Sequence, residues 1–228
     1  MHVEANFVTS AAGAGDFPRD RLPELAMVGR SNVGKSSLIN ALVRRPLART
    51  SATPGKTRLA NFYRVQRGTA AAFHLVDLPG YGYARGGDAS AREFRKLAEA
   101  YFSRAAGSGL RASAGDAEAS NVSVLATSAQ PGARSPKPVA MAVWLLVDSR
   151  HPGLESDLEA WSWLQSQPVA RSIVGTKVDK LSRAERTRNA RDFELLFQTP
   201  VLLVSAQTGE GLDELWKMIA RLPSQTVA

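Results

Sequence analysis

The sequence predicts a three-layer α/β protein, in which a mostly parallel, six-stranded sheet carries helices on both faces. Two observations favour this class. Short apolar runs alternate along the chain with segments of helical periodicity, and such alternation is typical of parallel sheets with helical crossovers. The chain also has 228 residues, 44% of them apolar, which suits one domain with a sizeable core.

Six apolar runs are predicted to form the strands, because they are short and rich in aliphatic or aromatic residues. They comprise residues 25–28, 60–65, 72–76, 140–147, 171–175 and 201–204. A turn near Gly68 joins the second strand to the third.

Five segments place apolar residues at helical spacing and are predicted helices: residues 36–42, 91–102, 155–164, 183–197 and 212–222. Pro46 ends the first, because a proline ring cannot continue the helical hydrogen-bond ladder. Glycines at positions 82, 86 and 87 predict a mobile loop before the second.

One domain, residues 23–222, is expected to contain all these elements. Residues 1–22 are predicted to be an N-terminal extension and residues 223–228 a C-terminal tail. Residues 103–138 are rich in Ala, Ser and Gly and contain no aromatic residue, which predicts a flexible insertion inside the domain.

Charge and composition restrict the partners and the compartment. The net charge of +8 favours a polyanionic partner such as RNA, DNA or an acidic membrane surface. There is no cysteine, so disulfides and thiolate metal sites are excluded. No signal-peptide pattern is visible, and the longest apolar run, residues 139–147, is too short to cross a bilayer. We therefore expect a soluble, cytoplasmic protein, with a monomer as the default.

The strongest motif matches G-x-x-x-x-G-K-[ST] and lies between the first predicted strand and the first predicted helix. Its residues are Gly29, Arg30, Ser31, Asn32, Val33, Gly34, Lys35 and Ser36. Backbone N–H groups of such a loop close around phosphate oxygens, and the helix N-terminus adds its positive dipole end. Lys35 would reach the β- and γ-phosphates, while Ser36 would bind Mg²⁺.

A second motif, D-x-x-G, ends the third predicted strand with Asp77, Leu78, Pro79 and Gly80. Asp77 would hold Mg²⁺ through water, and the Gly80 N–H would sense the γ-phosphate. Alone, this string is also an ordinary turn, so its meaning depends on the phosphate loop upstream.

A third motif, [NT]-K-x-D, follows the fifth predicted strand with Thr176, Lys177, Val178 and Asp179. The Asp179 carboxylate can accept hydrogen bonds from guanine N1–H and the 2-amino group. Adenine offers neither donor and would leave the carboxylate unpaired, so guanine is favoured. Lys177 would lie along the base plane.

Two weaker segments complete the candidate site. Val204, Ser205 and Ala206 end the last strand, where a small residue lets a backbone N–H approach guanine O6. The basic loop of residues 49–59 contains three hydroxyl residues that could close over Mg²⁺, namely Ser51, Thr53 and Thr57. Their spacing alone does not choose among them.

These motifs stand in the order of a Ras-like GTPase domain with a phosphate-binding loop. Three longer strings, residues 29–37, 48–57 and 76–84, together with residues 148–152, closely resemble the EngB (YihA/YsxC) family of bacterial GTPases. The resemblance covers residues 22–222 apart from the insertion. It implies GTP hydrolysis with Mg²⁺, a role in assembling the large ribosomal subunit, and a requirement in normal cell division and septation.

The resemblance also selects Thr57 as the Mg²⁺-binding residue of the loop. The catalytic residues are then expected to be Lys35, Thr57 and Gly80. The loop adds five nucleotide-contacting residues to those of the motifs: Gly55, Lys56, Thr57, Arg58 and Leu59. Two departures from the family are visible, namely the insertion and Gly175, which stands where the family has an apolar residue.

Tyr81 occupies the place where Ras-like enzymes carry a glutamine that orients water. Tyrosine lacks the amide's combined donor and acceptor, so slow intrinsic hydrolysis is expected. Asn32 resembles the asparagine that binds K⁺ in related GTPases, which makes it a candidate K⁺ ligand; the alternative is that Asn32 only caps the loop. The string Asp148–Pro152 has no role that the sequence reveals, and His151 is expected to be structural.

Ribosomal RNA is the expected partner, because cations gather in two segments. Residues 41–72 contain no acidic residue but seven basic ones: Arg44, Arg45, Arg49, Lys56, Arg58, Arg64 and Arg67. Residues 180–191 form the second basic segment, which could equally be a solvated helix face. The rival interpretations are an ATP-using enzyme, which Asp179 disfavours, a GTP-dependent RNA-binding module with negligible hydrolysis, and a division protein at the membrane.

Overall fold

The computed structural model describes residues 2–48, 59–81, 87–104, 139 and 141–222, and of residues 87–91 and 93 the backbone only. The predicted insertion from residue 105 onward, most of the basic loop of residues 49–59, and the tail lie outside this part. The division of the chain into extension, domain, insertion and tail therefore stays a prediction.

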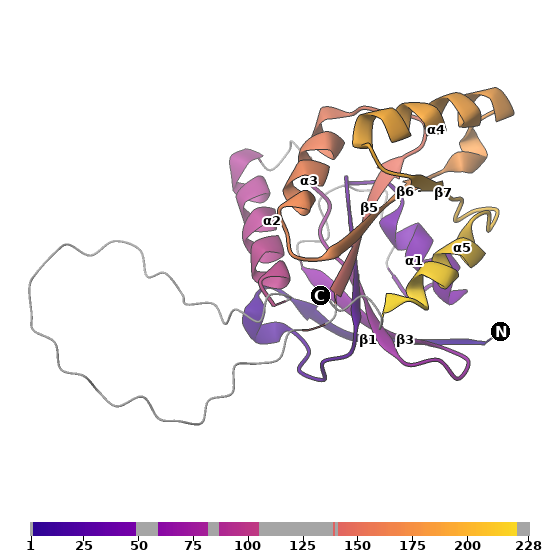
Figure 1. Cartoon of the computed structure of the whole chain (residues 1–228). Coiled ribbons are helices and arrows are strands. Elements are labelled where there is room, and N and C mark those ends of the chain that lie inside the picture. The colour runs from indigo at the N-terminus through magenta and orange to yellow at the C-terminus, as the bar shows by residue number, and fades with distance from the viewer. Residues whose placement is uncertain (1, 49–58, 82–86, 105–138, 140, 223–228) are drawn as a thin grey trace, which may run out of the picture.

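Seven strands form one sheet in the order β1-β3-β4-β2-β5-β6-β7 (Figure 1). In chain order they are β1 (Val3–Ala11), β2 (Glu24–Gly29), β3 (Ala60–Arg67), β4 (Phe73–Asp77), β5 (Met141–Asp148), β6 (Ala170–Thr176) and β7 (Val201–Leu203). Strands β4, β2, β5, β6 and β7 run parallel, while β3 is antiparallel to β4 and to β1. The predicted α/β class and its mostly parallel sheet are confirmed.

The predicted number of six strands is wrong, because the N-terminal segment adds β1 to the edge of the sheet. This strand pairs with β3 and has a bulge between Phe7 and Thr9. Only Ala5 and Ala11 of its nine residues are buried, and Phe7 is 54% exposed. An edge strand that buries so little carries no clear apolar alternation, so the sequence pattern did not reveal it.

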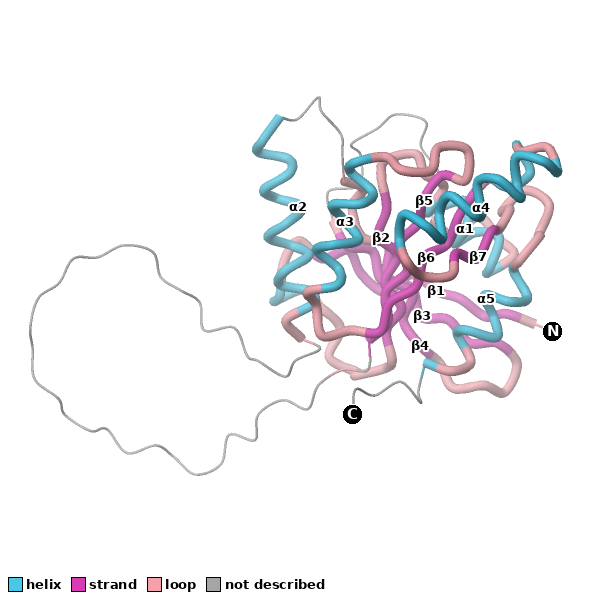
Figure 2. Tube along the Cα trace, turned by 45° about the horizontal axis from the view of Figure 1, so that its top comes forward, coloured by secondary structure: helices cyan, strands magenta, loops and turns pink. Residues whose placement is uncertain are grey.

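Helices cover both faces of the sheet, giving the three layers (Figure 2). Helices α1 (Lys35–Val43) and α5 (Leu212–Ile219) pack on one face, and α2 (Gly87–Phe102), α3 (Glu155–Gln165) and α4 (Arg183–Phe197) on the other. Two short 3-10 turns, η1 (Ala14–Asp16) and η3 (Val178–Lys180), lie in the connections. No described helix is both long and apolar enough to span a membrane.

The central strands hold the loops that follow them. Every residue of β2 and β5 is buried, because each strand has a core on both faces. Burial on both faces explains why these strands read as continuous apolar runs rather than alternating ones. The loops at their carboxyl ends therefore start from the most tightly packed part of the protein.

Candidate functional site

The loops after β2, β4, β6 and β7 meet at the carboxyl end of the sheet, where open α/β sheets bind their ligands. These loops carry the three motifs and the Val204–Ala206 segment. The structure thus brings together residues that are up to 177 positions apart in the sequence, from Gly29 to Ala206.

Two glycines shape the loop between β2 and α1. At Gly29 a Cβ atom would lie 2.8 Å from the Leu146 carbonyl oxygen of β5 and 2.9 Å from Val33, so no side chain fits there. Gly34 has a φ of 112°, which favours glycine, and α1 begins directly after it without a side-chain cap. The first N–H groups of α1 are consequently left for a ligand, and an anion suits them.

Lys35, Ser36 and Asp77 gather inside this loop. The Lys35 Nζ donates to the Gly29 carbonyl oxygen at 3.1 Å, and the Ser36 hydroxyl lies 3.4 Å from Asp77 Oδ2. Burial raises the pKa of Asp77 while Lys35 and Ser36 lower it, and burial lowers the pKa of Lys35 against the pull of Asp77. The Asp77 Oδ1 atom is buried and has no hydrogen-bond partner among the described residues.

This donor set fits a hydrated Mg²⁺ ion. A hydroxyl and a carboxylate with one unpartnered oxygen offer the hard oxygen ligands that Mg²⁺ prefers, and water and phosphate oxygens would supply the others. Ser36 would bind the ion directly and Asp77 through water. The third predicted ligand, Thr57, lies outside the described residues.

The D-x-x-G segment lies against the phosphate loop. A Cβ atom on Gly80 would stand 2.9 Å from the backbone nitrogen of Ser31, so the close approach requires glycine. The Ser31 N–H donates to the carbonyl oxygen of Tyr81 at 3.2 Å. Leu78 is buried in the core, with its N–H bonded to the Met27 carbonyl oxygen at 3.2 Å.

The Tyr81 side chain contacts α2 and α3. Its hydroxyl donates to Asp157 Oδ1 at 2.8 Å, and its ring packs against Phe94 of α2. Burial, reinforced by the Asp157 charge, raises the pKa of the Tyr81 hydroxyl. The hydroxyl of Tyr81 is therefore engaged in a structural contact, and sequence reasoning missed Asp157 as its partner.

The Thr176–Asp179 segment is tied to the phosphate loop. The Thr176 hydroxyl donates to the Val33 carbonyl oxygen at 2.6 Å, and the Lys177 Nζ donates to that of Asn32 at 2.7 Å. Both Asn32 and Lys177 adopt a positive φ, 62° and 63°, which is uncommon for residues with a side chain. Contacts between the two loops hold these conformations.

Asp179 lies next to the last strand segment. The Ser205 hydroxyl donates to Asp179 Oδ1 at 2.7 Å, and this bond lowers the pKa of Asp179 from its usual value. The Ser205 N–H already donates to Glu210, whereas that of Ala206 has no partner among the described residues. Val178 N–H bonds to the Val204 carbonyl oxygen at 3.2 Å, so the two segments are in register.

Gly175 has a packing reason in this structure. A Cβ atom there would come within 2.6 Å of Leu203 and 3.0 Å of the Ser149 hydroxyl. Leu203 thus fills the space that an apolar side chain at position 175 would take, which accounts for the departure noted in the sequence.

The predicted switch loop is described only at its flanks. Residues 55–58, including Thr57, lie outside the described part, and Leu59 is 38% exposed. On the other flank, the Asn40 side chain of α1 accepts from the N–H of Ala48 at 2.7 Å and donates to its carbonyl oxygen at 2.9 Å. This double contact fixes the chain just before the loop.

Comparisons with known proteins agree with the geometry. The family model described as "50S ribosome-binding GTPase" matches residues 24–120. A probable GTP-binding protein EngB of Pelotomaculum thermopropionicum is 38% identical over 225 residues, covering 95% of this chain and 94% of that protein. The EngB protein of Solibacter usitatus is also 38% identical, over 95% of both chains. The chain belongs to the EngB family of GTP-binding proteins.

Solved structures share the fold. A crystal structure of a probable GTP-binding protein EngB superposes with a TM-score of 0.53 at 16% identity, covering 89% of this chain and 99% of the other. Aquifex aeolicus Era bound to GDP and aluminium fluoride superposes with a TM-score of 0.62 at 19% identity, and this chain spans 56% of Era. At these identities the likeness establishes the fold alone.

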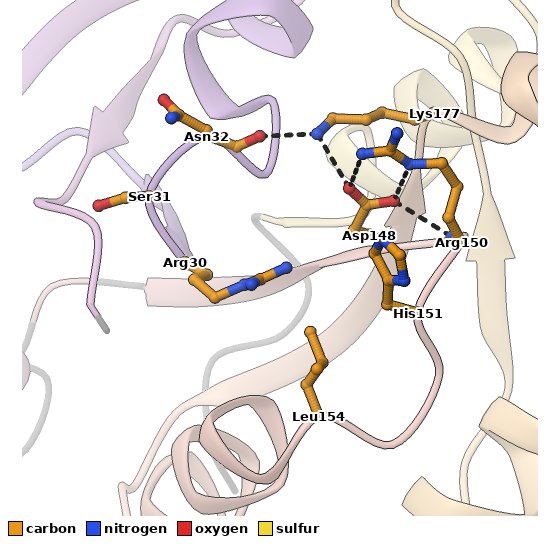
Figure 3. Close-up of a pocket in the computed structure, with 8 residues that line it drawn as sticks. All are labelled: Arg30, Ser31, Asn32, Asp148, Arg150, His151, Leu154 and Lys177. Carbon is orange, nitrogen blue, oxygen red and sulfur yellow. Dashed lines mark hydrogen bonds and ion pairs between the residues drawn. The ribbon is translucent and has the colours of Figure 1, made fainter. Parts of the chain in front are cut away.

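One cavity of about 480 Å³ lies beside the phosphate loop of this EngB-family chain (Figure 3). It is lined by Arg30, Ser31, Asn32, Asp148, Arg150, His151, Leu154 and Lys177. It shares four residues with the predicted nucleotide-contacting set, namely Arg30, Ser31, Asn32 and Lys177, but Lys35, Ser36 and Asp179 do not line it. Arg30 reaches toward Arg150 and His151, and the side-chain amide of Asn32 points away from Lys177.

The cavity brings the string Asp148–Pro152 into the site. The Asp148 carboxylate accepts from Arg150 and from Lys177, a role that the sequence did not reveal. A usable signal was present, because Asp148 ends a buried apolar strand in the same way as Asp77. His151 is exposed at the rim, with its N–H bonded to the Asp148 carbonyl oxygen at 3.0 Å.

Proposed function

We propose that this EngB-family protein binds GTP and GDP with Mg²⁺, hydrolyses GTP, and uses the change of nucleotide as a switch in assembly of the large ribosomal subunit. One observation carries the nucleotide part: the loops after β2, β4, β6 and β7 put an uncapped helix N-terminus, Lys35, Asp77 and Asp179 at one edge of the sheet.

Guanine recognition is assigned to Asp179 and Ala206. The Ser205 hydroxyl fixes Asp179 as a carboxylate, which is the form that accepts from guanine N1–H and the 2-amino group. The Ala206 N–H is then the backbone donor for guanine O6. An adenine ring would leave both groups without partners, at a cost of roughly a hundredfold in affinity.

Hydrolysis uses the groups around the phosphates. Bound Mg²⁺ supplies charge neutralisation to the β- and γ-phosphate oxygens. The Lys35 ammonium and the N–H groups at the start of α1 stabilise the negative charge on the transferring phosphoryl group. Loss of the γ-phosphate releases Gly80 and Thr57, so the segments around them change conformation between the GTP and GDP states.

Intrinsic hydrolysis is proposed to be slow, because the Tyr81 hydroxyl is bonded to Asp157 rather than facing the phosphates. The side-chain amide of Asn32 points away from Lys177, and it is proposed to hold K⁺ beside the phosphates, where the ion would add positive charge. Single-turnover hydrolysis in matched K⁺ and Na⁺ buffers tests this. Equal rates remove the K⁺ role, and no hydrolysis even with ribosomal subunits leaves a GTP-dependent RNA-binding module.

The proposed ribosomal role is supported by membership of the EngB family and by the exposed basic residues of this chain. Arg44, Arg45 and Arg64 are exposed on the described part of the basic segment, whereas Arg67 lies over the Trp216 ring. On the second segment Arg183, Arg188 and Arg191 are exposed, while Arg186 is bonded to Glu210 at 2.8 Å. The exposed cations are the ones available to RNA phosphates, whose binding weakens with salt.

Sedimentation with large ribosomal subunits tests this role. The expected result is salt-sensitive binding with a non-hydrolysable GTP analogue and weaker binding with GDP. Binding that ignores the nucleotide would contradict the switch. The requirement in cell division and septation is proposed as a consequence of assembly, and depletion that blocks septation while subunits assemble normally would contradict it.

Competition binding tests the nucleotide assignment directly. Fluorescent GDP is displaced from the wild type and from Asp179→Asn by GTP, ATP or XTP. The wild type should prefer GTP and the variant XTP, because the amide reverses the hydrogen-bond polarity toward the base. Equal binding of ATP by the wild type would reopen the interpretation as an ATP-using enzyme.

A further inference from the structure

The carboxylate of Asp148 stands between the two loops that would hold a nucleotide. Asp148 is the last residue of β5, and β5 lies between β2 and β6 in the sheet. The register pairs Leu146 with Gly29 on one side and Asp148 with Thr176 on the other. The loops after β2 and β6 therefore leave the sheet on either side of Asp148, whose side chain is only 2% exposed.

Both oxygens of this carboxylate are occupied by cations (Figure 3). Arg150 donates from Nε to Oδ1 at 2.9 Å, from its terminal nitrogen to Oδ2 at 2.7 Å, and from its backbone N–H to Oδ1 at 3.1 Å. Lys177 donates from Nζ to Oδ2 at 2.9 Å. The arginine grips the carboxylate with two parallel bonds, which fixes its orientation as well as its charge.

The same Lys177 ammonium also contacts the phosphate loop. Its second bond, 2.7 Å long, goes to the carbonyl oxygen of Asn32. A chain of contacts thus runs from Arg150 through Asp148 and Lys177 to Asn32. Lysine alone is a flexible residue with a mobile point charge, so the carboxylate is what restricts its ammonium to one place.

We propose that Asp148, held by Arg150, is a positioning residue for nucleotide binding: it directs the Lys177 side chain along the base and joins the base-binding loop to the phosphate loop. The inference rests on the proposed function, since it assumes that a guanine nucleotide occupies the site. Neither Asp148 nor Arg150 belongs to the sequence motifs that predicted the site.

Loss of Asp148 is expected to weaken nucleotide binding without slowing hydrolysis of the bound GTP. Lys177 contacts the base side of the nucleotide, which is identical in GDP and GTP, so loss of Asp148 weakens both to the same extent. The phosphate-facing Lys35 and Ser36 do not line this cavity, so the rate at saturating GTP is retained. Guanine preference is also retained, because Asp179 sets it.

The test compares Asp148→Asn with wild type by fluorescent GDP and GTP binding and by steady-state hydrolysis. The amide that replaces the carboxylate at position 148 keeps one acceptor oxygen but places an N–H donor against the two cations, Arg150 and Lys177. We expect the Kd for both nucleotides and the KM for GTP to rise about 10- to 100-fold, with kcat within about threefold. Glu24→Gln is the matched control, because Glu24 is an equally buried carboxylate paired with an arginine far from the loops.

Three further variants guard against a folding defect. Arg150→Gln removes a half-exposed side chain. It should also weaken nucleotide binding, but by less than Asp148→Asn does. Asp148→Asn combined with Lys177→Gln should bind no worse than Lys177→Gln alone, because Asp148 acts through Lys177.

Affinity that falls no more than in Glu24→Gln, additive losses in the double variant, or a fall in kcat without a change in Kd would overturn the positioning role. A wild type that binds no guanine nucleotide would instead overturn the proposed function itself. The two failures are therefore distinguishable in one set of measurements.

Discussion

Asp77 and Glu24 are buried carboxylates on neighbouring strands, one at the carboxyl end of β4 and the other at the amino end of β2. Their side chains are 3% and 1% exposed, and burial raises the pKa of both. Arg104 donates to both oxygens of Glu24, at 2.9 and 3.4 Å, and also to the Pro18 carbonyl oxygen at 3.2 Å. At Asp77, Lys35 and Ser36 are the groups that lower the carboxyl pKa, and the Oδ1 atom has no partner among the described residues.

The difference separates a structural ion pair from a ligand site. At the amino end the guanidinium also stacks on Phe17 at 4.9 Å, so charge and packing are both satisfied within the chain. At the carboxyl end, in the part of the chain that the structure describes, the Asp77 Oδ1 atom has no partner and the start of α1 has no side-chain cap. Because an unsatisfied buried polar group is costly, a ligand that bonds to the Asp77 oxygen would stabilise this end of the sheet.

Arg104→Met should give the largest effect on stability. Methionine keeps the apolar stem but leaves the buried Glu24 without its cation, which lowers the free energy of unfolding by about 3 kcal/mol. Urea unfolding of the nucleotide-free protein measures this. Nucleotide affinity of the folded protein should not change.

The matched exposed pair is Lys217 with Glu214, 3.7 Å apart. Lys217→Met should change stability far less than Arg104→Met, because solvent screens the pair. If both substitutions cost the same, the amino-end cluster has no special structural role.

Lys35→Met makes the same kind of change at the carboxyl end and should act on chemistry. Among the described residues Lys35 donates to one acceptor, the Gly29 carbonyl oxygen, so stability should fall by less than in Arg104→Met. GTP hydrolysis should fall about 100- to 1,000-fold, because a cation aimed at the developing charge is lost. Single-turnover kinetics measures this rate. A rate equal to that of the wild type would mean that Lys35 does not contact the GTP phosphates.

Tyr81→Phe tests whether the hydroxyl of the residue after D-x-x-G stabilises the fold or takes part in GTP hydrolysis. The variant loses the bond to Asp157, whose Oδ2 already lacks a partner among the described residues, so stability should fall by about 1–2 kcal/mol. The hydrolysis rate should stay within about threefold. A large drop in rate with unchanged stability would mean that the hydroxyl serves the reaction.

The sequence predicted the carboxyl end better than the amino end for a physical reason. Gly34, Asp77 and Asp179 each follow an apolar strand in a motif with fixed local spacing, so short windows were enough to find them. Glu24 and Arg104 are 80 residues apart and meet only after α2 packs on the sheet. No local pattern encodes that pairing.

Asp148 falls between these cases. Its position after an apolar run was readable, but its partner Lys177 lies 29 residues away, directly after the next strand of the sheet. Strand β1 was missed because an edge strand with two buried alanines has no apolar face to detect. The predicted residues 55–58 remain predictions, since they lie beyond the described part.

The smallest expected effect concerns His74 of β4, whose buried side chain lies 3.2 Å from Asp20 beside the Glu24–Arg104 pair. Burial lowers the pKa of His74; Asp20 opposes this shift, whereas Arg104 and Arg64 add to it. As the pH falls through about 6.5, the unfolded chain therefore binds a proton at His74 that the folded protein does not yet bind. Stability is complete above that pH and is lost as the pH falls through the folded-state pKa, by at most about 1.4 kcal/mol per pH unit.

His74→Gln should remove this dependence, so urea unfolding between pH 8 and pH 5 should show a flatter slope than wild type. Asp20→Asn should do the opposite, because loss of the opposing carboxylate lowers the pKa of His74 further and extends the loss to lower pH. Equal slopes in all three proteins would mean that the folded protein binds a proton at His74 as readily as the unfolded chain does. The amino-end cluster would then hold a second buried cation, and its contrast with the Lys35–Asp77 site would lie in accessibility rather than in charge.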